Sequence, residues 1–70
     1  MAVKHKLIKE RDFEEAMQRE DRVRVFEGDY IVNNGGIIIR FDDDIIVIQS
    51  SVSDVTYYSR NECEFFVVRN

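Results

Sequence analysis

Two hydrophobic periods divide this chain. Near the start, Phe13, Ala16 and Met17 recur at the spacing of one helical face. Asp12, followed three residues later by Glu15, is an aspartate version of the capping box. The pattern therefore predicts a helix that begins at Phe13, with Asp12 as its N-cap, and ends near Glu20. A helix this short needs packing against another element to be stable.

From Arg22 onward apolar and polar residues alternate, as in half-buried strands. Gly28-Asp29 and Asn34-Gly35 suit two-residue hairpin turns, because glycine and asparagine tolerate positive φ. Asp42-Asp43-Asp44 suits a third turn, of even length. The cross-strand pairs expected around these turns are Glu27 with Tyr30, Val25 with Val32, Val32 with Ile37, Tyr30 with Ile39, Asp29 with Arg40, Phe41 with Ile46 and Ile39 with Ile48.

In this register one face of the sheet forms the core, with Val23, Val25, Tyr30, Val32, Ile37, Ile39, Phe41, Ile46 and Ile48. An odd-length aspartate turn would instead put Ile45 and Val47 on that face. The even count is preferred because it leaves Arg40, Val47 and Gln49 on the second face.

The second face also carries Phe26, Ile31 and Ile38, and one short helix cannot cover both faces. Either the sheet curls until later strands close over one side, or these three residues form a homodimer or partner face.

Outside this meander the pattern is weaker. Val3 to Ile8 is a candidate first strand, Ser50 to Ser53 reads as a loop, and Asp54 to Arg60 alternates again. In that last strand Tyr58 is assigned to the solvent side, with Thr56 and Arg60. Residues 61–68 allow two interpretations: a helical turn opened by Asn61 before a closing strand from Phe65 to Val68, or one short helix.

These elements predict an α+β fold, with one short N-terminal helix packed on a twisted antiparallel β-meander of four to six strands. The alternative is a closed, SH3-like small β-barrel. Residues 1–70 form one small domain with a thin core, and residues 1–3 and 69–70 are expected to fray.

Composition limits where in the cell the protein is expected to work. The single cysteine, Cys63, excludes an internal disulfide framework, and the N-terminal stretch lacks the apolar run of a secretory signal. The longest apolar runs, Ile37 to Ile39 and Ile45 to Ile48, are far shorter than the roughly 20 residues that cross a bilayer. We therefore expect a cytoplasmic protein that does not contact a membrane.

Catalytic chemistry has little support in the sequence. The only histidine, His5, lies in a lysine-rich segment, away from any candidate nucleophile. Cys63 lies between Glu62 and Glu64, whose charges raise a thiol pKa, so we expect it to be a packing residue. Asn34-Gly35-Gly36 lacks the lysine and the strand-to-helix context of a phosphate loop. The expectation is a protein that is not an enzyme and uses no cofactor.

The aspartate triplet could bind calcium or magnesium through its oxygens. It does not follow the alternate spacing of an EF-hand loop, and three consecutive side chains cannot all point one way. It is therefore predicted to be a solvated turn, with no metal, that also protects the Ile-rich strands from aggregation.

Charge and aromatic residues suggest a surface for a partner. The net charge is −4, although Lys4, Lys6, Lys9 and Arg11 make the N-terminal segment basic. The acidic residues and the Tyr and Arg types enriched at interfaces predict a partner-binding set. Its members are Asp42, Asp43, Asp44, Asp54, Tyr58 and Arg60.

The leading hypothesis is a non-enzymatic protein-interaction module, a small acidic inhibitor or regulator that docks on an unidentified partner protein. In general character the chain looks like accessory proteins of phages and mobile elements, a likeness that no motif supports. The alternative function is a small β-barrel that binds nucleic acid through the basic N-terminal segment with Tyr58 and Arg60. The acidic total argues against nucleic acid.

Overall fold

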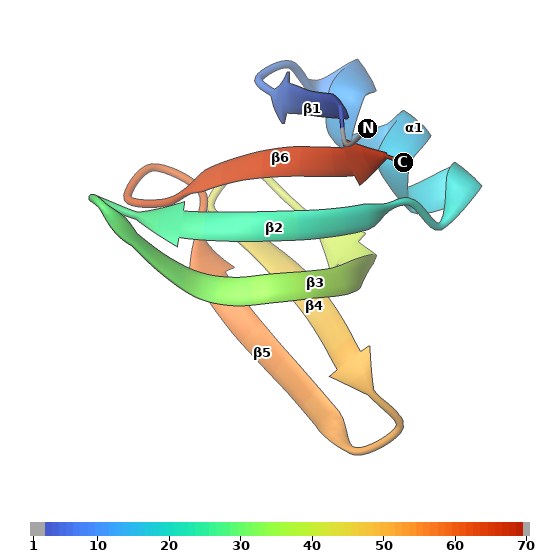
Figure 1. Ribbon diagram of the computed structural model, residues 1–70. Coiled ribbons are helices and arrows are strands. Elements are labelled where there is room, and N and C mark those ends of the chain that lie inside the picture. The colour runs from blue at the N-terminus through green and yellow to red at the C-terminus, as the bar shows by residue number, and fades with distance from the viewer. Residues whose placement is uncertain (1–2, 70) are drawn as a thin grey trace.

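The computed structural model describes residues 3–69 as one helix and a single six-stranded antiparallel sheet (Figure 1). The elements are β1 (Val3–Leu7), α1 (Glu10–Arg19), β2 (Arg22–Glu27), β3 (Tyr30–Phe41), β4 (Ile45–Ser51), β5 (Asp54–Ser59) and β6 (Glu64–Arg69). The predicted α+β meander is confirmed. The sheet is not closed, so the SH3-like barrel is wrong.

The strands lie in the order β1-β6-β2-β3-β4-β5. β2 to β5 form the meander, and β6 returns to pair with β2, with β1 outside it. In Figure 1, β4 and β5 run diagonally behind β2, β3 and β6, while α1 lies beside the β1–β6 edge. Residues 3–69 contain no helix that is both long and apolar enough to span a membrane.

The two ends of the chain also differ from what the sequence predicted. Among the residues expected to fray, residues 1, 2 and 70 lie outside the described part of the chain. Val3 pairs with Arg69, so these two belong to the ends of β1 and β6. Residues 64–69 form a strand, so the single-helix interpretation of residues 61–68 is wrong. The turn before β6 opens at the Ser59 carbonyl, which accepts the N–H of Glu62 and of Cys63, rather than at Asn61.

The Gly28-Asp29 hairpin is confirmed, with Glu27 opposite Tyr30 and Gly28 at a φ of 63°. One pair further along, Phe26 lies opposite Ile31. The register then shifts, so that Asn33 rather than Val32 faces Val25. The predicted Val25–Val32 pair is wrong because hairpin parity cannot show this bulge.

The predicted turn at Asn34-Gly35 is wrong. β3 runs without interruption through this stretch, pairing with β2 as far as Ile37 and then with β4 from Ile37 onward. Within residues 3–69, positive φ occurs at Glu20 and Gly28, so Gly35 does not adopt the backbone of a two-residue hairpin turn. The predicted pairs Val32–Ile37, Tyr30–Ile39 and Asp29–Arg40 therefore do not form.

Gly36 explains why the chain stays extended here. Its missing side chain lets β4 approach closely: a Cβ at this position would overlap Ile48 Cγ2 and lie 3.1 Å from the Gln49 carbonyl oxygen. A glycine inside a strand often marks such a close approach. Gly36 is thus required for close packing between β3 and β4.

The core lies on the inner side of the bent sheet and beneath α1. Its buried members are Leu7, Phe13, Ala16, Val23, Val25, Ile38, Ile46, Ile48, Phe65 and Val67. The even aspartate turn is confirmed, since Phe41 lies opposite Ile46. Ile46 and Ile48 are core residues as predicted.

The assignment of the middle of β3 is wrong. Ile38 is 1% exposed and faces Ile48, whereas Ile39 is 46% exposed, and Tyr30 and Val32 also lie on the surface. Continuing β3 through Gly35 and Gly36 changes which side chains face inward. A second register shift, between Ile38 and Arg40, then returns Phe41 to the core side.

α1 begins three residues earlier than predicted. Lys9 is its N-cap, and Asp12 occupies the third helical position. The Asp12 carboxylate accepts the N–H of Lys9 and of Ile8, each at 3.0 Å. Asp12 therefore caps the helix from within its first turn. The predicted apolar face is confirmed, with Phe13 and Ala16 buried and Met17 packed against the core.

Candidate protein-interaction surface

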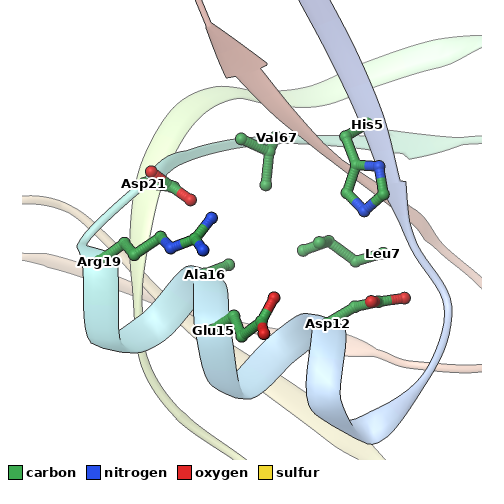
Figure 2. Close-up of a pocket in the computed structure, with 8 residues that line it drawn as sticks. All are labelled: His5, Leu7, Asp12, Glu15, Ala16, Arg19, Asp21 and Val67. Atoms are coloured by element: carbon green, nitrogen blue, oxygen red, sulfur yellow. The ribbon is translucent and has the colours of Figure 1, made fainter.

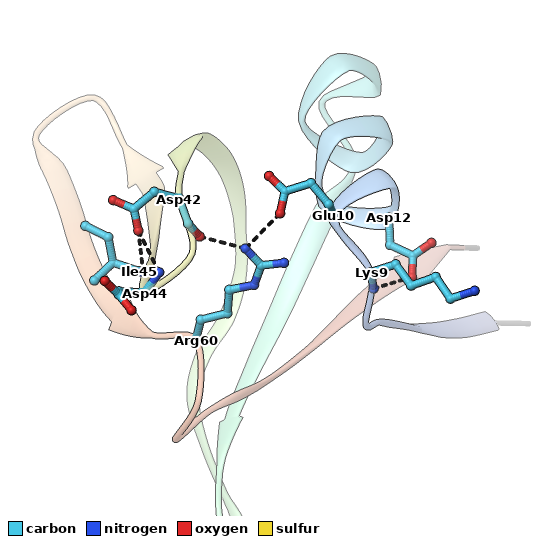
Figure 3. A network of polar contacts seen from close by, with 7 residues as sticks. All are labelled: Lys9, Glu10, Asp12, Asp42, Asp44, Ile45 and Arg60. Atoms are coloured by element: carbon cyan, nitrogen blue, oxygen red, sulfur yellow. Dashed lines mark hydrogen bonds and ion pairs between the residues drawn. The ribbon is translucent and has the colours of Figure 1, made fainter.

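Three residues of the predicted partner-binding set meet where α1 faces two turns (Figure 3). Arg60 Nη1 donates to the Asp42 carbonyl oxygen at 2.7 Å and lies 3.1 Å from Glu10 Oε1. The backbone N–H of Arg60 donates to the Asp44 carbonyl oxygen at 2.8 Å. These bonds tie the β3–β4 turn to the end of β5 and to the helix.

The Arg60 side chain is mostly withdrawn from solvent. It is 15% exposed, and its guanidinium carbon lies 4.6 Å from the ring centroid of Phe13 and 5.9 Å from that of Phe41. An arginine over an aromatic face adds cation–π attraction to its hydrogen bonds. The structure therefore gives Arg60 a stabilising position between three segments of the chain.

Asp42 organises the turn that the sequence predicted. Its Oδ1 accepts the N–H of Asp44 at 2.8 Å and of Ile45 at 2.9 Å. The side chains of Asp43 and Asp44 are exposed. Within residues 3–69 no group of three or more His, Cys, Asp and Glu side chains is arranged to hold a metal ion.

The two capping aspartates should make stability depend on pH. Backbone hydrogen bonds, chiefly from Lys9 to Asp12 and from Ile45 to Asp42, lower both pKa values below the reference of 3.8. A carboxylate whose pKa is lowered in the folded state adds stability that is fully present above the unfolded pKa. That stability is lost as the pH falls through the folded pKa. In urea unfolding from pH 7 to pH ~2, D12N and D42N should each show a shallower acid loss than the unsubstituted protein. An unchanged acid slope in both variants would contradict the capping assignment.

Tyr58 faces inward, so its assignment to solvent is wrong. It pairs with Ile46 and shares the inner side of the sheet, where its ring packs edge-on to Phe65 at 6.5 Å. Its hydroxyl accepts a hydrogen bond from Asn33 Nδ2 at 3.2 Å and donates to the Val32 carbonyl oxygen at 3.4 Å. Its neighbour Tyr57 is 61% exposed on the outer side.

Exposed apolar residues, which we call the outer strip, lie on the outer side of β3, β4 and β5, with the polar residues Gln49 and Arg40 among them. Cross-strand pairing places Ile37 beside Gln49 and Gln49 beside Val55, while Val47 lies beside Tyr57. Ile37, Ile39, Gln49 and Val52 also line one shallow pocket of about 350 Å³. The outer strip consists of Ile37, Ile39, Val52, Val55 and Tyr57, with buried Val47 beneath them.

Aspartates lie at both ends of the outer strip. Asp42–Asp44 form the turn at one end of β4, and Asp54 begins β5 at the other end. The Asp54 carboxylate accepts a hydrogen bond from Ser51 Oγ at 3.0 Å. The predicted acidic residues therefore flank an exposed apolar surface, although Asp54 and the triplet are separated by the length of β4.

The predicted dimer or partner face does not form as one surface, because Ile38 is buried in the core. Phe26 is half-buried, with its ring 5.4 Å from that of Phe66, and its strand partner Ile31 is exposed. Alternation along the chain predicted an uncovered second face, but it did not predict its exposed members Ile39, Val55 and Tyr57. The alternation of Val55 and Tyr57 was the available signal.

A second surface feature is a cleft of about 340 Å³ between α1 and the β1–β6 edge, lined by both charged and apolar side chains (Figure 2). Its lining includes His5, Glu15, Arg19 and Asp21 together with Asp12. The lowered pKa of Asp12 comes chiefly from capping the helix, so it does not mark a catalytic group.

The remaining candidate residues have ordinary structural surroundings. Lys6 Nζ lies 3.0 Å from Glu64 Oε2 in an exposed ion pair. The pKa of the Cys63 thiol is raised, first by burial and then by the charges of Glu27 and Glu62. This direction agrees with the sequence expectation, and the part played by Glu27 follows from the fold. A raised pKa disfavours the reactive thiolate.

Comparisons of the chain with protein-family models, curated proteins and solved structures found no match.

Proposed function

We propose that this chain is a non-enzymatic protein-interaction module, a small acidic inhibitor or regulator that docks on a partner protein through the outer strip. The observation that carries the proposal is the exposure of Ile39, Val55 and Tyr57 on one face of the sheet. Contiguous exposed apolar residues rimmed by polar ones often mark interaction sites. The phage-like character remains a prediction from composition.

The chemistry of the partner follows from the residues around the outer strip. Tyrosine is enriched among residues that dominate binding energy, and Tyr57 lies near the middle of β5, beside Val47 of β4. Asp43, Asp44 and Asp54 put negative charge at both ends, and the whole chain has a net charge of −4. Electrostatic complementarity favours a partner with an apolar patch flanked by basic residues.

The nucleic-acid alternative has less support. It needs Tyr58 and Arg60 as an exposed stacking platform, but Tyr58 packs toward Phe65 and Arg60 lies over Phe13. Lys6, in the basic N-terminal segment, is paired with Glu64. We therefore propose protein rather than nucleic acid as the partner.

The test compares two double variants of the immobilised protein in lysate from the cells that express it. Ile39→Ser with Tyr57→Ser removes apolar surface from the outer strip. Glu14→Ser with Gln18→Ser makes a matched change on the exposed side of α1. A captured partner should be retained by the unsubstituted protein and the α1 control, and recovered at least about tenfold less with the strip variant.

A third variant carries Asp43→Asn and Asp44→Asn in the otherwise unsubstituted chain. It should capture the partner less well, and the loss should be largest at low salt, where charges are least screened. The proposal fails if the strip variant retains the same proteins as the unsubstituted chain. It also fails if no protein is recovered above the level of bare resin.

A further inference from the structure

β5 is an open edge of the sheet. Within the described chain it pairs with β4 on one side only, at the end of the order β1-β6-β2-β3-β4-β5. The other edge strand, β1, has the sequence VKHKL, whose lysines discourage strand pairing. β5 reads DVTYYS, without lysine or proline. The register of the β4–β5 pair shifts between Gln49 and Ser51, beside Asp54. From Val55 to Ser59, β5 pairs with β4 in one continuous register.

The free backbone groups on β5 can be assigned from one hydrogen bond. The Arg60 N–H donates to the Asp44 carbonyl oxygen, so Arg60 points its backbone groups toward β4. Antiparallel ladders alternate, and Tyr58 and Thr56 therefore also bond to β4. Tyr57 and Val55, which lie between them, direct their N–H and C=O groups to the open edge. Within residues 3–69, β4 is the one strand that pairs with β5, so these four groups face no other strand.

Two kinds of strand could pair with the β5 edge: the β5 strand of a second copy of this chain, or a strand of another protein. The charges near β5 discriminate between them. In an antiparallel pair of two β5 strands, Asp54 of one copy would approach the Asp44 end of the other. Arg60 directly follows β5 at that end, but its side chain is 15% exposed and is held by Glu10 and the Asp42 carbonyl oxygen. The exposed charges that Asp54 would meet there are those of Asp43 and Asp44, between chains that each carry a net charge of −4. A foreign strand with basic residues at both ends would instead meet Asp54 at one end and Asp43 and Asp44 at the other.

We propose that the β5 edge binds an extended segment of the partner by antiparallel strand addition. The segment pairs through its backbone with Val55 and Tyr57, places apolar side chains beside theirs on the outer strip, and carries basic residues at both ends. Main-chain bonds supply affinity in this mode, and alternate side chains supply specificity. This inference rests on the proposed function and names how the partner is held.

The probe is a synthetic peptide with blocked ends, Lys-Lys-Val-Thr-Val-Thr-Val-Lys-Lys, titrated into the full chain. Its control has glutamate in place of every lysine. We expect the lysine peptide to bind at least about tenfold more tightly than the glutamate peptide at low salt. Binding should slow amide hydrogen exchange at Val55 and Tyr57. The amides of Thr56 and Tyr58 should be slow even without peptide.

A matched pair of protein variants isolates the contribution of the backbone N–H of residue 55 to peptide binding. Val55→Pro removes an N–H that faces the edge and leaves the bonds to β4 in place, whereas Val55→Thr keeps that N–H. Val55→Pro should weaken peptide binding at least about tenfold, and Val55→Thr only about threefold or less. Circular dichroism checks the fold of each variant. The exchange measurement on the unsubstituted chain tests the proposal even if Val55→Pro does not fold.

Strand addition is overturned if the exchange of Val55 and Tyr57 does not change with peptide, or if a folded Val55→Pro binds as well as Val55→Thr. It is also overturned if sedimentation shows a dimer that Val55→Pro abolishes, because the occupant is then a second copy. If Val55→Pro captures the cellular partner normally while the Ile39→Ser, Tyr57→Ser variant does not, strand addition is wrong and the proposed function stands. If the peptide binds but no partner is captured, the proposed function fails while the edge remains a strand-binding site.

Discussion

Replacing Arg60 with methionine is expected to lower the free energy of unfolding by about 2 kcal/mol. Methionine can keep the apolar contact with Phe13 but loses the hydrogen bond to the Asp42 carbonyl oxygen, which is 2.7 Å long. A hydrogen bond that involves a charged group contributes about 1.5–3 kcal/mol, and cation–π attraction adds about 0.5–1 kcal/mol or more. Urea denaturation of the two proteins at pH 7 measures the difference.

Glu10→Gln is the matched control, because it removes the ion pair with Arg60 and leaves the other contacts. The Glu10 side chain is 61% exposed, so this change should cost less than about 1 kcal/mol. If Arg60→Met costs no more than Glu10→Gln, Arg60 is a surface residue that does not hold the turns together. It could then belong to the interaction surface, as its residue type first suggested.

The role of Arg60 shows what local patterns cannot predict. Its partners Phe13 and Asp42 are far away in sequence, and only the fold brings them to one place. Alternation correctly put Tyr58 and Arg60 on the same side of β5. It could not say which side faces inward, because Tyr57 and Tyr58 make both sides equally aromatic.

The elements that local chemistry determines were predicted well. The apolar face of α1 follows from residue spacing, and the even aspartate turn follows from Asp42, which bonds to nearby N–H groups of the same turn. Asn34-Gly35 was misassigned because its hairpin preference is also local, whereas packing between strands decides its conformation. The acidic ends of the candidate surface could be predicted from sequence. Its apolar centre, Ile39 and Tyr57, required the true path of β3 and the inward side of β5.

Everything proposed about this surface depends on β3 passing straight through Asn34, Gly35 and Gly36. That path puts Ile38 in the core and Ile39 outside, and it carries β4 and β5 around to leave β5 at an open edge. Gly36 is the position where the path is most constrained. A methyl group there would overlap Ile48 Cγ2 and lie 3.3 Å from Ser50 Oγ. At Gly35, in contrast, the nearest atoms are 3.9 Å away, in the Arg22 side chain.

The unfolding free energies of Gly36→Ala and Gly35→Ala, measured side by side by urea denaturation, test this path most directly. We predict that Gly36→Ala costs about 1–3 kcal/mol through overpacking against the fully buried Ile48. Gly35→Ala should change stability by no more than about 0.5 kcal/mol, because its φ is not positive and the site has room. A hairpin at Asn34-Gly35 would need positive φ at Gly35 and would reverse the order. A costly Gly35→Ala beside a neutral Gly36→Ala would therefore contradict the continuous β3 strand and the open β5 edge that follows from it.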